Sequence, residues 1–283
     1  MLRIGLFVAT NLAVLLVLSV VLNLLGLNQP GQGTGGMLAF AALFGMGGAL
    51  ISLLLSKTLA ARSVGAQIIE TPRNEGEQWL VSTVARLAQN AGIGMPQVAV
   101  FESDGPNAFA TGANKDAALV AVSSGLLRTM TQDEVEAVLG HEISHVANGD
   151  MVTLALLQGV LNTFVMVFAQ LLAAVIDRGE DRSRPGMGYY LGYYAAQAVL
   201  GFLASIVVMW FSRFREYRAD AGGAHLAGRE KMIAALERLR RVANPESLPN
   251  SMVALGIAGG LGHLLASHPP LEARIQRLRE APL

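Results

Sequence analysis

The sequence contains no cysteine, which excludes disulfide bonds and every metal or redox site built on thiolates. Charged residues are also scarce: they make up 15% of the chain, whereas soluble domains usually carry about 25%. The formal net charge is zero, so no basic character indicates a nucleic-acid partner. Because 52% of the 283 residues are hydrophobic, the composition predicts a membrane protein embedded in a lipid bilayer.

Four long apolar runs account for this composition. Each is long enough to cross a bilayer as a helix. A cleaved signal peptide is the alternative for the first run, because Arg3 precedes it, but a second run follows closely and favours a retained helix. A fifth apolar stretch, residues 252–266, is short and glycine-rich, which favours a buried helix over a span. The predicted spans are residues 4–27, 37–55, 152–176 and 191–212.

The segment between the second and third spans, residues 58–150, has a different character. It carries charges, turn residues and mixed periodicity, which indicate a water-exposed domain. We expect strands at 97–101 and 117–122, with turns between them. Thr131 followed by Glu134 is a capping box that predicts the start of a helix. Residues 213–283 are polar and predominantly helical by pattern.

The predicted helix after Thr131 carries the sequence H-E-x-x-H at residues 141–145. His141 and His145 are four residues apart, so their imidazoles lie on one helix face and reach one metal ion. A chance occurrence on a solvated helix is the plain alternative. The capped helix instead favours one catalytic Zn²⁺, with Glu142 as the base that takes a proton from the zinc-bound water and passes it to the leaving amine.

A catalytic zinc site needs a third protein ligand, which must be a carboxylate or a histidine. Asp150 follows the helix end too closely and is expected to point off the face that His145 uses. The fourth span is expected to continue as a helix through Glu216 and Asp220, which share a face at i and i+4. Antiparallel packing of the third and fourth spans would bring Glu216 beside His145. Glu216 is therefore the predicted third ligand, and Asp220 is predicted to hydrogen-bond a ligand imidazole.

These features predict a mainly α membrane protein. It has four transmembrane helices and a cytosolic α+β protease domain of the zincin type (gluzincin) with a small β-sheet. The expected parts are residues 1–57 with two spans, 58–150 with the catalytic helix, 151–212 as a transmembrane hairpin and 213–283 as the helical part that completes the zinc site. An intramembrane protease is disfavoured because Asp133, Glu134 and Glu136 precede the motif on the same helix.

Several motifs together resemble the HtpX family of bacterial membrane zinc metalloproteases, which are related to the CAAX prenyl proteases. The resemblance implies an inner-membrane endopeptidase that acts on misfolded or damaged membrane proteins, with its active site facing the cytosol. It also implies His141, His145 and Glu216 as zinc ligands and Glu142 as the catalytic residue. The matching motifs are N-A-F-A-T-G at 107–112, L-G-H-E-I-S-H at 139–145, N-G-D-M at 148–151, R-E-Y-R-A-D at 215–220 and S-H-P-P-L-E at 267–272.

Secondary site candidates carry open alternatives. Asn107, Ala108, Phe109 and Ala110 form either a turn or an edge strand that holds the substrate backbone. His268 precedes two prolines and either donates to the oxyanion, fills a fourth zinc position or caps the next helix. If His268 is a fourth ligand, a rival function arises, a non-proteolytic membrane scaffold with a structural zinc site. Three further residues are weaker candidates: His225 and His263, expected to be structural or solvated, and Tyr217, a minor oxyanion candidate.

The distribution of basic residues predicts the orientation in the membrane. Basic residues cluster at the span ends on the side of residues 58–150, whereas the first loop on the other side is uncharged and the arginines of the 177–188 loop are balanced by acids. The positive-inside rule then places both termini and the catalytic side in the cytoplasm. Polypeptides, and membrane proteins among them, are the expected substrates. The sequence specifies neither the cleavage preference nor the oligomeric state. The flanking basic residues are Arg3, Lys57, Arg62, Arg213, Arg215 and Arg218.

Overall fold

The computed structural model describes residues 16, 19–20, 34–176, 186–242 and 268–281. Its residues divide into two compact units, each built from two separate stretches of the chain. The first unit comprises Met1–Ser52 and Val152–Val208, and the second comprises Leu53–Met151 and Met209–Leu283. The predicted segment 252–266 lies outside the described residues, and so do residues 4–27 apart from 16 and 19–20.

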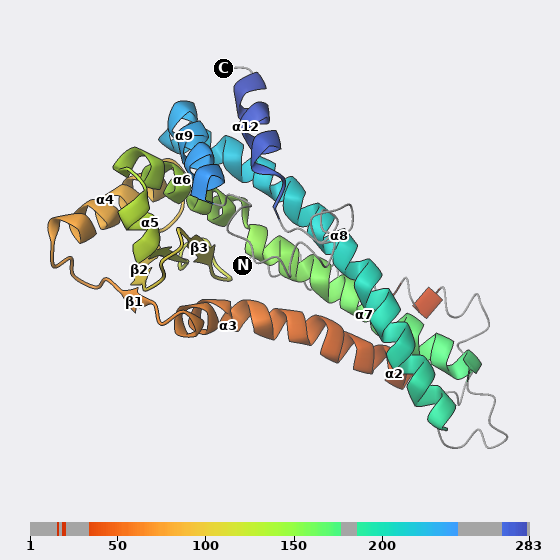
Figure 1. Ribbon diagram of the computed structural model, residues 1–283. Helices are drawn as coiled ribbons and strands as arrows, with labels where there is room; N and C mark the ends of the chain where they lie inside the picture. Colours follow the sequence, from red (N-terminus) through yellow and green to blue (C-terminus); the bar gives the residue numbers. More distant parts are fainter. Residues whose placement is uncertain (1–15, 17–18, 21–33, 177–185, 243–267, 282–283) are drawn as a thin grey trace. The chain divides into compact units, whose positions relative to one another are not determined.

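Long apolar helices form the first unit. Within the described residues, three helices are long and apolar enough to span a membrane: Leu38–Ser63, Asp150–Ile176 and Met187–Ala227. They coincide with the second, third and fourth predicted spans. The helix predicted to end near residue 55 continues to Ser63, because a helix can extend past its apolar run. The elements that lie wholly or partly in this unit are α2 (Thr34–Ala41), the π-helical turn η1 (Ala42–Met46), α3 (Gly47–Ser63), α7 (Asp150–Ile176) and α8 (Met187–Ala227) (Figure 1).

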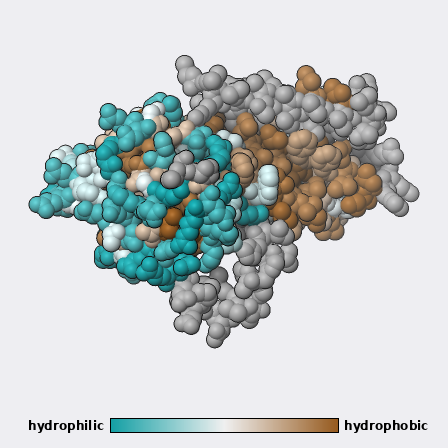
Figure 2. Space-filling view, turned by 90° about the horizontal axis from the view of Figure 1, so that it is seen from above, coloured by the Kyte–Doolittle hydropathy of each residue, from teal (hydrophilic) through white to brown (hydrophobic). Residues whose placement is uncertain are grey.

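The surfaces of the two units differ in character (Figure 2). Hydrophobic side chains cover the helices of the first unit, as lipid contact requires. Hydrophilic side chains cover most of the visible surface of the second unit. The fourth predicted span is one helix of 41 residues, so its polar end passes into the second unit without a break.

A four-stranded sheet lies in the second unit, with strand order β1-β2-β4-β3. β2 and β4 pair in parallel, and the two outer strands pair antiparallel to their neighbours. The prediction for 97–101 matches β2, and that for 117–122 matches β4 within two residues. The turn alternative for 107–110 is wrong, because β3 is an outer strand of the sheet. The strands are β1 (Gln67–Ile68), β2 (Gln97–Phe101), β3 (Ala108–Thr111) and β4 (Leu119–Ser123).

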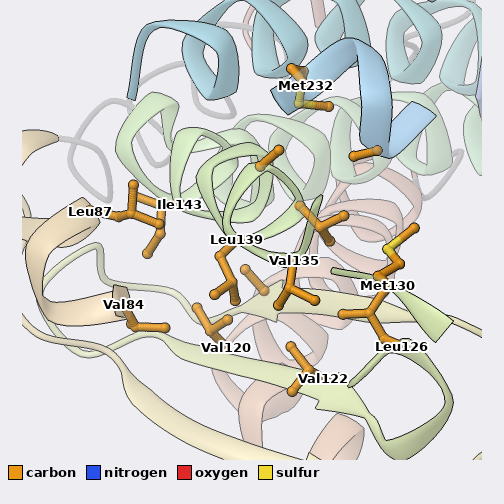
Figure 3. Close-up of a cluster of buried hydrophobic side chains, with 14 of the residues drawn as sticks. Val84, Leu87, Val120, Val122, Leu126, Met130, Val135, Leu139, Ile143 and Met232 are labelled. Atoms are coloured by element: carbon orange, nitrogen blue, oxygen red, sulfur yellow. The ribbon is translucent and has the colours of Figure 1, made fainter. Parts of the chain in front are cut away.

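Helices cover both faces of this sheet. Side chains of α4, α6 and α9 form the main core together with β4, as Val84, Leu139 and Val120 illustrate (Figure 3). The last turn of α3 covers the other face, where Ala61 packs with Ala99 and Phe101. The helices of this unit are α4 (Glu75–Asn90), α5 (Ser124–Thr129), α6 (Gln132–Asn148), α9 (Arg229–Val242) and α12 (Leu271–Glu280), together with the end of α8.

The two ends of α6 are defined by local sequence. Thr131 and Glu134 form the expected capping box, with reciprocal side-chain to backbone hydrogen bonds. At the other end Gly149 adopts a left-handed conformation (φ 69°), which glycine does without steric cost. α7 begins immediately afterwards, at Asp150. These caps fix the register in which α6 presents the H-E-x-x-H motif.

Candidate metal centre and active site

The two histidines of α6 lie one turn apart and are buried, with 7% of His141 and 6% of His145 exposed. Their Nε2 atoms face each other at 3.1 Å. Two neutral imidazoles that point lone pairs at each other repel, so this arrangement requires a proton or a cation between them.

Glu216 of α8 completes a triangle with these nitrogens. Its Oε2 lies 3.4 Å from His141 Nε2, and its Oε1 lies 3.2 Å from His145 Nε2. Donors about 2.0–2.1 Å from a tetrahedral zinc ion lie roughly 3.3 Å from one another, which is the spacing seen here. The structure therefore brings together the three residues that the sequence analysis selected as ligands.

A close crossing of α6 and α8 makes this meeting possible. A Cβ atom at Gly223 of α8 would lie 2.9 Å from the backbone nitrogen of His141, and one at Gly140 of α6 would lie 3.3 Å from the carbonyl oxygen of Gly223. The missing side chains let the two backbones approach. Asp220 and Glu216, about one and two turns before the crossing, then reach the histidine face.

Each imidazole turns its other nitrogen to a carboxylate. His141 Nδ1 lies 3.0 Å from Asp220 Oδ1, and His145 Nδ1 lies 2.7 Å from Asp150 Oδ2. An Nδ1–H held by a carboxylate leaves the lone pair on Nε2, where a metal would bind. The expectation that Asp150 points away from His145 is wrong, because the left-handed turn at Gly149 brings its side chain back over the helix end.

Arg274 of α12 is a site residue that the sequence analysis missed. Its guanidinium is buried and binds Asp220 through two hydrogen bonds of 2.7 and 2.6 Å. Its Nη1 also lies 3.6 Å from Glu216 Oε2. The available signal was an arginine on the apolar stripe of its helix, between Leu271 and Leu278.

Two further residues adjoin the cluster. The Nδ1 atom of the largely exposed His268 lies 2.7 Å from Glu216 Oε2. Glu142 Oε2 accepts a 2.9 Å hydrogen bond from the backbone N–H of Ala110 in β3. The edge strand and the motif glutamate are therefore in direct contact. Two of the three weaker candidates are described: His225 is exposed, and the Tyr217 ring lies 4.6 Å from the Arg277 guanidinium. His263 falls outside the described residues.

The electrostatics of the cluster favour positive charge at its centre. Burial lowers the pKa of His141, but Asp220 and Glu216 outweigh it and raise this pKa to about 9. For His145, burial is likewise outweighed by Asp150 and Glu216, and its pKa is raised. Burial raises the pKa of Glu142, which suits a group that must accept and release a proton.

The residues fit a divalent metal ion on this evidence. Glu216 Oε2 is buried and makes no geometrically adequate hydrogen bond. It faces two imidazole nitrogens whose outer nitrogens are already held by carboxylates. A cation bound among these three side chains would satisfy the carboxylate oxygen and remove the repulsion between the nitrogens.

Comparison with known proteins identifies the family. The model for "Peptidase family M48" matches residues 74–282, which is most of the chain and includes the whole cluster. The chain belongs to peptidase family M48. Within M48 it is similar to Protease HtpX of Stenotrophomonas maltophilia (strain K279a), with 58% identity over 98% of this chain and 97% of that relative. Protease HtpX of Glaesserella parasuis is 55% identical and covers 99% of both chains.

One solved structure is also similar to this chain in its fold. The crystal structure of S. mikatae Ste24p matches with a TM-score of 0.60 at 20% identity, over 85% of this chain and 58% of that one. This likeness concerns the fold. The resemblance to HtpX proteases is confirmed, and the M48 chain is an integral membrane metallopeptidase that hydrolyses polypeptides. Because the chain belongs to a peptidase family, the enzyme is favoured over the alternative of a non-proteolytic membrane scaffold.

Proposed function

We propose that this M48 peptidase uses one Zn²⁺ per chain, held by His141, His145 and Glu216, as the centre of an endopeptidase site. The triangle of donors at 3.1–3.4 Å carries the proposal. Zinc content of purified wild type and Glu216→Ala tests it. We expect about one zinc per wild-type chain and a large loss in the variant, and unchanged zinc content would exclude Glu216 as a ligand.

Glu142 is the proposed catalytic base and acid. A bound zinc ion supplies Lewis acidity, which acidifies a water and polarises the peptide carbonyl. Glu142 takes the proton of the attacking water and delivers it to the leaving amine. Its contact with Ala110 N–H holds the carboxylate at the edge of the site, between α6 and β3.

The Glu142→Gln variant tests this role. It keeps the shape of the side chain but removes the base, so cleavage of unfolded casein should fall by roughly 10²–10⁴-fold while zinc content stays at the wild-type level. Glu280→Gln, the same change at an exposed position of α12, should cleave like wild type. Equal cleavage by wild type and Glu142→Gln would refute the mechanism.

The proposed substrate platform is the outer edge of β3 together with the residue before it, and consists of Asn107, Ala108, Phe109 and Ala110. Ala110 N–H donates to Glu142 and therefore points away from β4. Backbone groups two residues apart on a strand face the same way, so those of Ala108 are presented on the same side. A substrate in extended conformation would pair there and pass directly beside Glu142.

His268 is proposed to act at the same site, where its contact with Glu216 supports either predicted role. An oxyanion donor and a fourth ligand differ in what His268→Ala would change. Loss of kcat with unchanged zinc affinity identifies an oxyanion donor, whereas weakened zinc affinity identifies a ligand. A variant equal to wild type in both would leave only a capping role for α12.

The remaining proposals concern location and substrates. We place the enzyme in the bacterial inner membrane with four spans, both termini and the gluzincin-type catalytic side in the cytoplasm, cutting misfolded or damaged membrane proteins. Because the chain lacks cysteine, single cysteines report topology directly. Arg279→Cys should react with an impermeant maleimide only after permeabilisation, and Met187→Cys should react in intact spheroplasts.

The proposed substrate class has its own test. When the enzyme and a membrane protein are placed together in lipid vesicles, a destabilised variant of that membrane protein should be cut faster than its stable parent.

A further inference from the structure

A cavity of about 660 Å³ opens in the second unit beside β1, the outer strand on the side of the sheet away from β3. Three strand spacings separate β1 from β3, which is about 14 Å across the sheet. None of the residues that line the cavity belongs to the metal cluster, so this surface is distinct from the proposed active site. Its apolar part includes Trp79, Leu80, Val100, Leu127, Met130 and Val135.

Two acidic residues, Glu77 and Glu102, line the same cavity, and no basic residue of the described chain does so. Within the part of the chain that the structure describes, neither carboxylate forms an ion pair. Glu77 instead accepts a hydrogen bond from the backbone N–H of Arg73, and Glu102 accepts one from the Ser124 hydroxyl. A positive charge next to an apolar group therefore suits this cavity, because the carboxylates attract the cation and the indole ring of its apolar part favours it too.

The backbone of β1 offers unused pairing groups at the same edge. Ile69 N–H donates to the Val98 carbonyl at 2.9 Å, and the register pairs Ile68 with Ala99. Hydrogen-bonded positions alternate in an antiparallel pair, so the N–H and C=O of Ile68 point away from β2. The side chain of Ile68 is 44% exposed. An extended polypeptide segment can therefore add to the sheet beside Ile68 as a fifth strand.

Alternation along such a strand decides which of its side chains reach the cavity. Gln67 and Val100 are paired in register and both line the cavity, so Ile68 faces the other side of the sheet. In an added strand the residue paired with Ile68 also faces that other side, and its two neighbours face the cavity. The cavity therefore takes side chains that are two positions apart, one basic and one apolar.

We propose that the β1 edge and its cavity form an exosite, a second binding site for the substrate protein that is remote from the cut bond. It binds an extended segment in which a basic residue and a large apolar residue are two positions apart. The proposal rests on the endopeptidase function proposed above and adds how the substrate is held. Lysine and arginine concentrate where spans of membrane proteins meet their cytosolic loops, so damaged membrane proteins supply such segments.

The fluorescence of Trp79 tests occupancy of the cavity. The chain has two tryptophans, so Trp210→Phe leaves Trp79 as the only one, and Glu142→Gln prevents cleavage. We expect a peptide in which arginine and leucine alternate with serine to cause a saturable change in the zinc-loaded full-length protein. A peptide of the same composition with arginine and leucine adjacent presents them on opposite faces, so it should bind at least about tenfold more weakly.

Two variants separate the contributions of charge and backbone. Glu77→Gln/Glu102→Gln removes both charges but keeps the hydrogen-bond acceptors, and should weaken binding of the alternating peptide about tenfold. Glu75→Gln, at an exposed position of the same helical turn outside the cavity, is the matched control. Ile68→Pro removes an N–H that faces away from β2, which an edge strand tolerates, and should weaken binding about tenfold too.

No saturable change of fluorescence, or equal affinity for both peptides, would overturn the proposal. For a membrane protein with an arginine and a leucine two positions apart beside its span, Ile68→Pro and Glu77→Gln/Glu102→Gln should raise KM and leave kcat unchanged. A short peptide without this pattern should be cut as by wild type. Unchanged KM in both variants would overturn the substrate role of the exosite.

Failure of the proposed function would look different. If the alternating peptide binds beside Trp79 but the zinc-loaded wild type cuts nothing that Glu142→Gln leaves intact, the endopeptidase function fails. The substrate role of the exosite then fails with it, although peptide binding at β1 persists.

Discussion

The two nitrogens of each imidazole in the site face different carboxylates. The Nδ1 atoms face Asp220 and Asp150, and the Nε2 atoms face Glu216. The outer carboxylates fix both the orientation and the tautomer of each ring, so both are already set before a metal binds. Asp220 is itself fixed by Arg274, which extends this chain of contacts to α12.

Arg274→Ala tests the importance of that outermost contact. It leaves Asp220 buried without its cation, so Asp220 should hold His141 less well and zinc affinity should fall roughly 10–100-fold. Competition with a chelator of known affinity measures this directly. Arg274→Lys keeps the charge but loses the two-pronged contact, and should be intermediate.

An exposed arginine of the same helix provides the control for this prediction. Arg279→Ala removes only an exposed ion pair with Glu237, so zinc affinity should stay at the wild-type value. If Arg274→Ala matched Arg279→Ala in zinc affinity, Arg274 would only fasten α12 to α8.

At the residue scale, the sequence predicted which side chains meet where spacing alone sets the geometry, and their roles as metal ligands stay predictions. His141 and His145 follow from helical periodicity, and Glu216 follows from the hairpin of two apolar helices. Asp150 was misjudged because its direction depends on one dihedral angle at Gly149. Arg274 was missed because α12 meets Asp220 across 54 residues of sequence, and no local pattern encodes that contact.

At the scale of elements, the crossing of α6 and α8 determines whether the three ligands meet. Gly223→Ala places a methyl group 2.9 Å from the His141 backbone nitrogen, which forces the helices apart. We expect weakened zinc binding and lower thermal stability, because the displaced atoms belong to backbone and cannot rotate away. Zinc titration and thermal unfolding in detergent measure the two effects.

Gly201→Ala on the same helix is the matched control. A Cβ atom there meets nothing within 4 Å, so zinc affinity should be unchanged and stability equal or slightly higher. A Gly223→Ala protein with normal zinc affinity would show that the crossing tolerates a wider separation than the structure has.

Glu136 of α6 joins three helices, because its carboxylate binds one basic residue of α4 and one of α9. Its carboxylate accepts hydrogen bonds from Arg86 and Lys231 at 2.9 and 2.8 Å. Burial raises the pKa of Glu136, but these two partners outweigh it and the pKa is lowered. The contact therefore stabilises the fold above the unfolded-state pKa of about 4.5 and loses this contribution as pH falls through the lower folded-state pKa.

The Glu136→Gln variant should show this pH dependence. Near pH 7 it should be less stable than wild type by roughly 1–3 kcal/mol, the range for hydrogen bonds to a charged group. The difference should begin to shrink as the pH falls below about 4.5, where the carboxyl of the unfolded chain becomes protonated, and should be lost as the pH falls through the lower pKa of the folded protein. Denaturant unfolding across this pH range measures it, and a constant difference would assign the loss to packing.

Element prediction from sequence depended on the length of the pattern. The long helices were predictable because each contains an apolar run long enough to cross a bilayer, and β2 was predictable as a short apolar run bounded by turn residues. β1 has two residues and α5 has six, so neither carries a pattern of its own. β3 was left open between turn and strand, because only its pairing with β4 decides the matter.

For the whole molecule, the candidate metal centre joins parts of the chain that the apolar segments separate. Two of the proposed ligands precede α7 and the third lies in the last half of α8, yet all three belong to the second unit. A metal ion bound there is a cross-link between α6 and α8 in the folded state. The unfolded chain lacks this arrangement of donors, so binding energy adds to folding stability.

Removal of the metal should therefore lower the thermal stability of the full chain. At a zinc concentration of about 100 times Kd the stabilisation is roughly 2.7 kcal/mol, which corresponds to a Tm shift of roughly 5–10 °C for a domain of this size. A chelator should remove this shift and added zinc should restore it. Glu216→Ala should show no zinc-dependent shift, because the remaining histidines bind too weakly. A wild-type Tm that is the same with and without zinc would mean that the ion, if bound, does not couple α6 to α8.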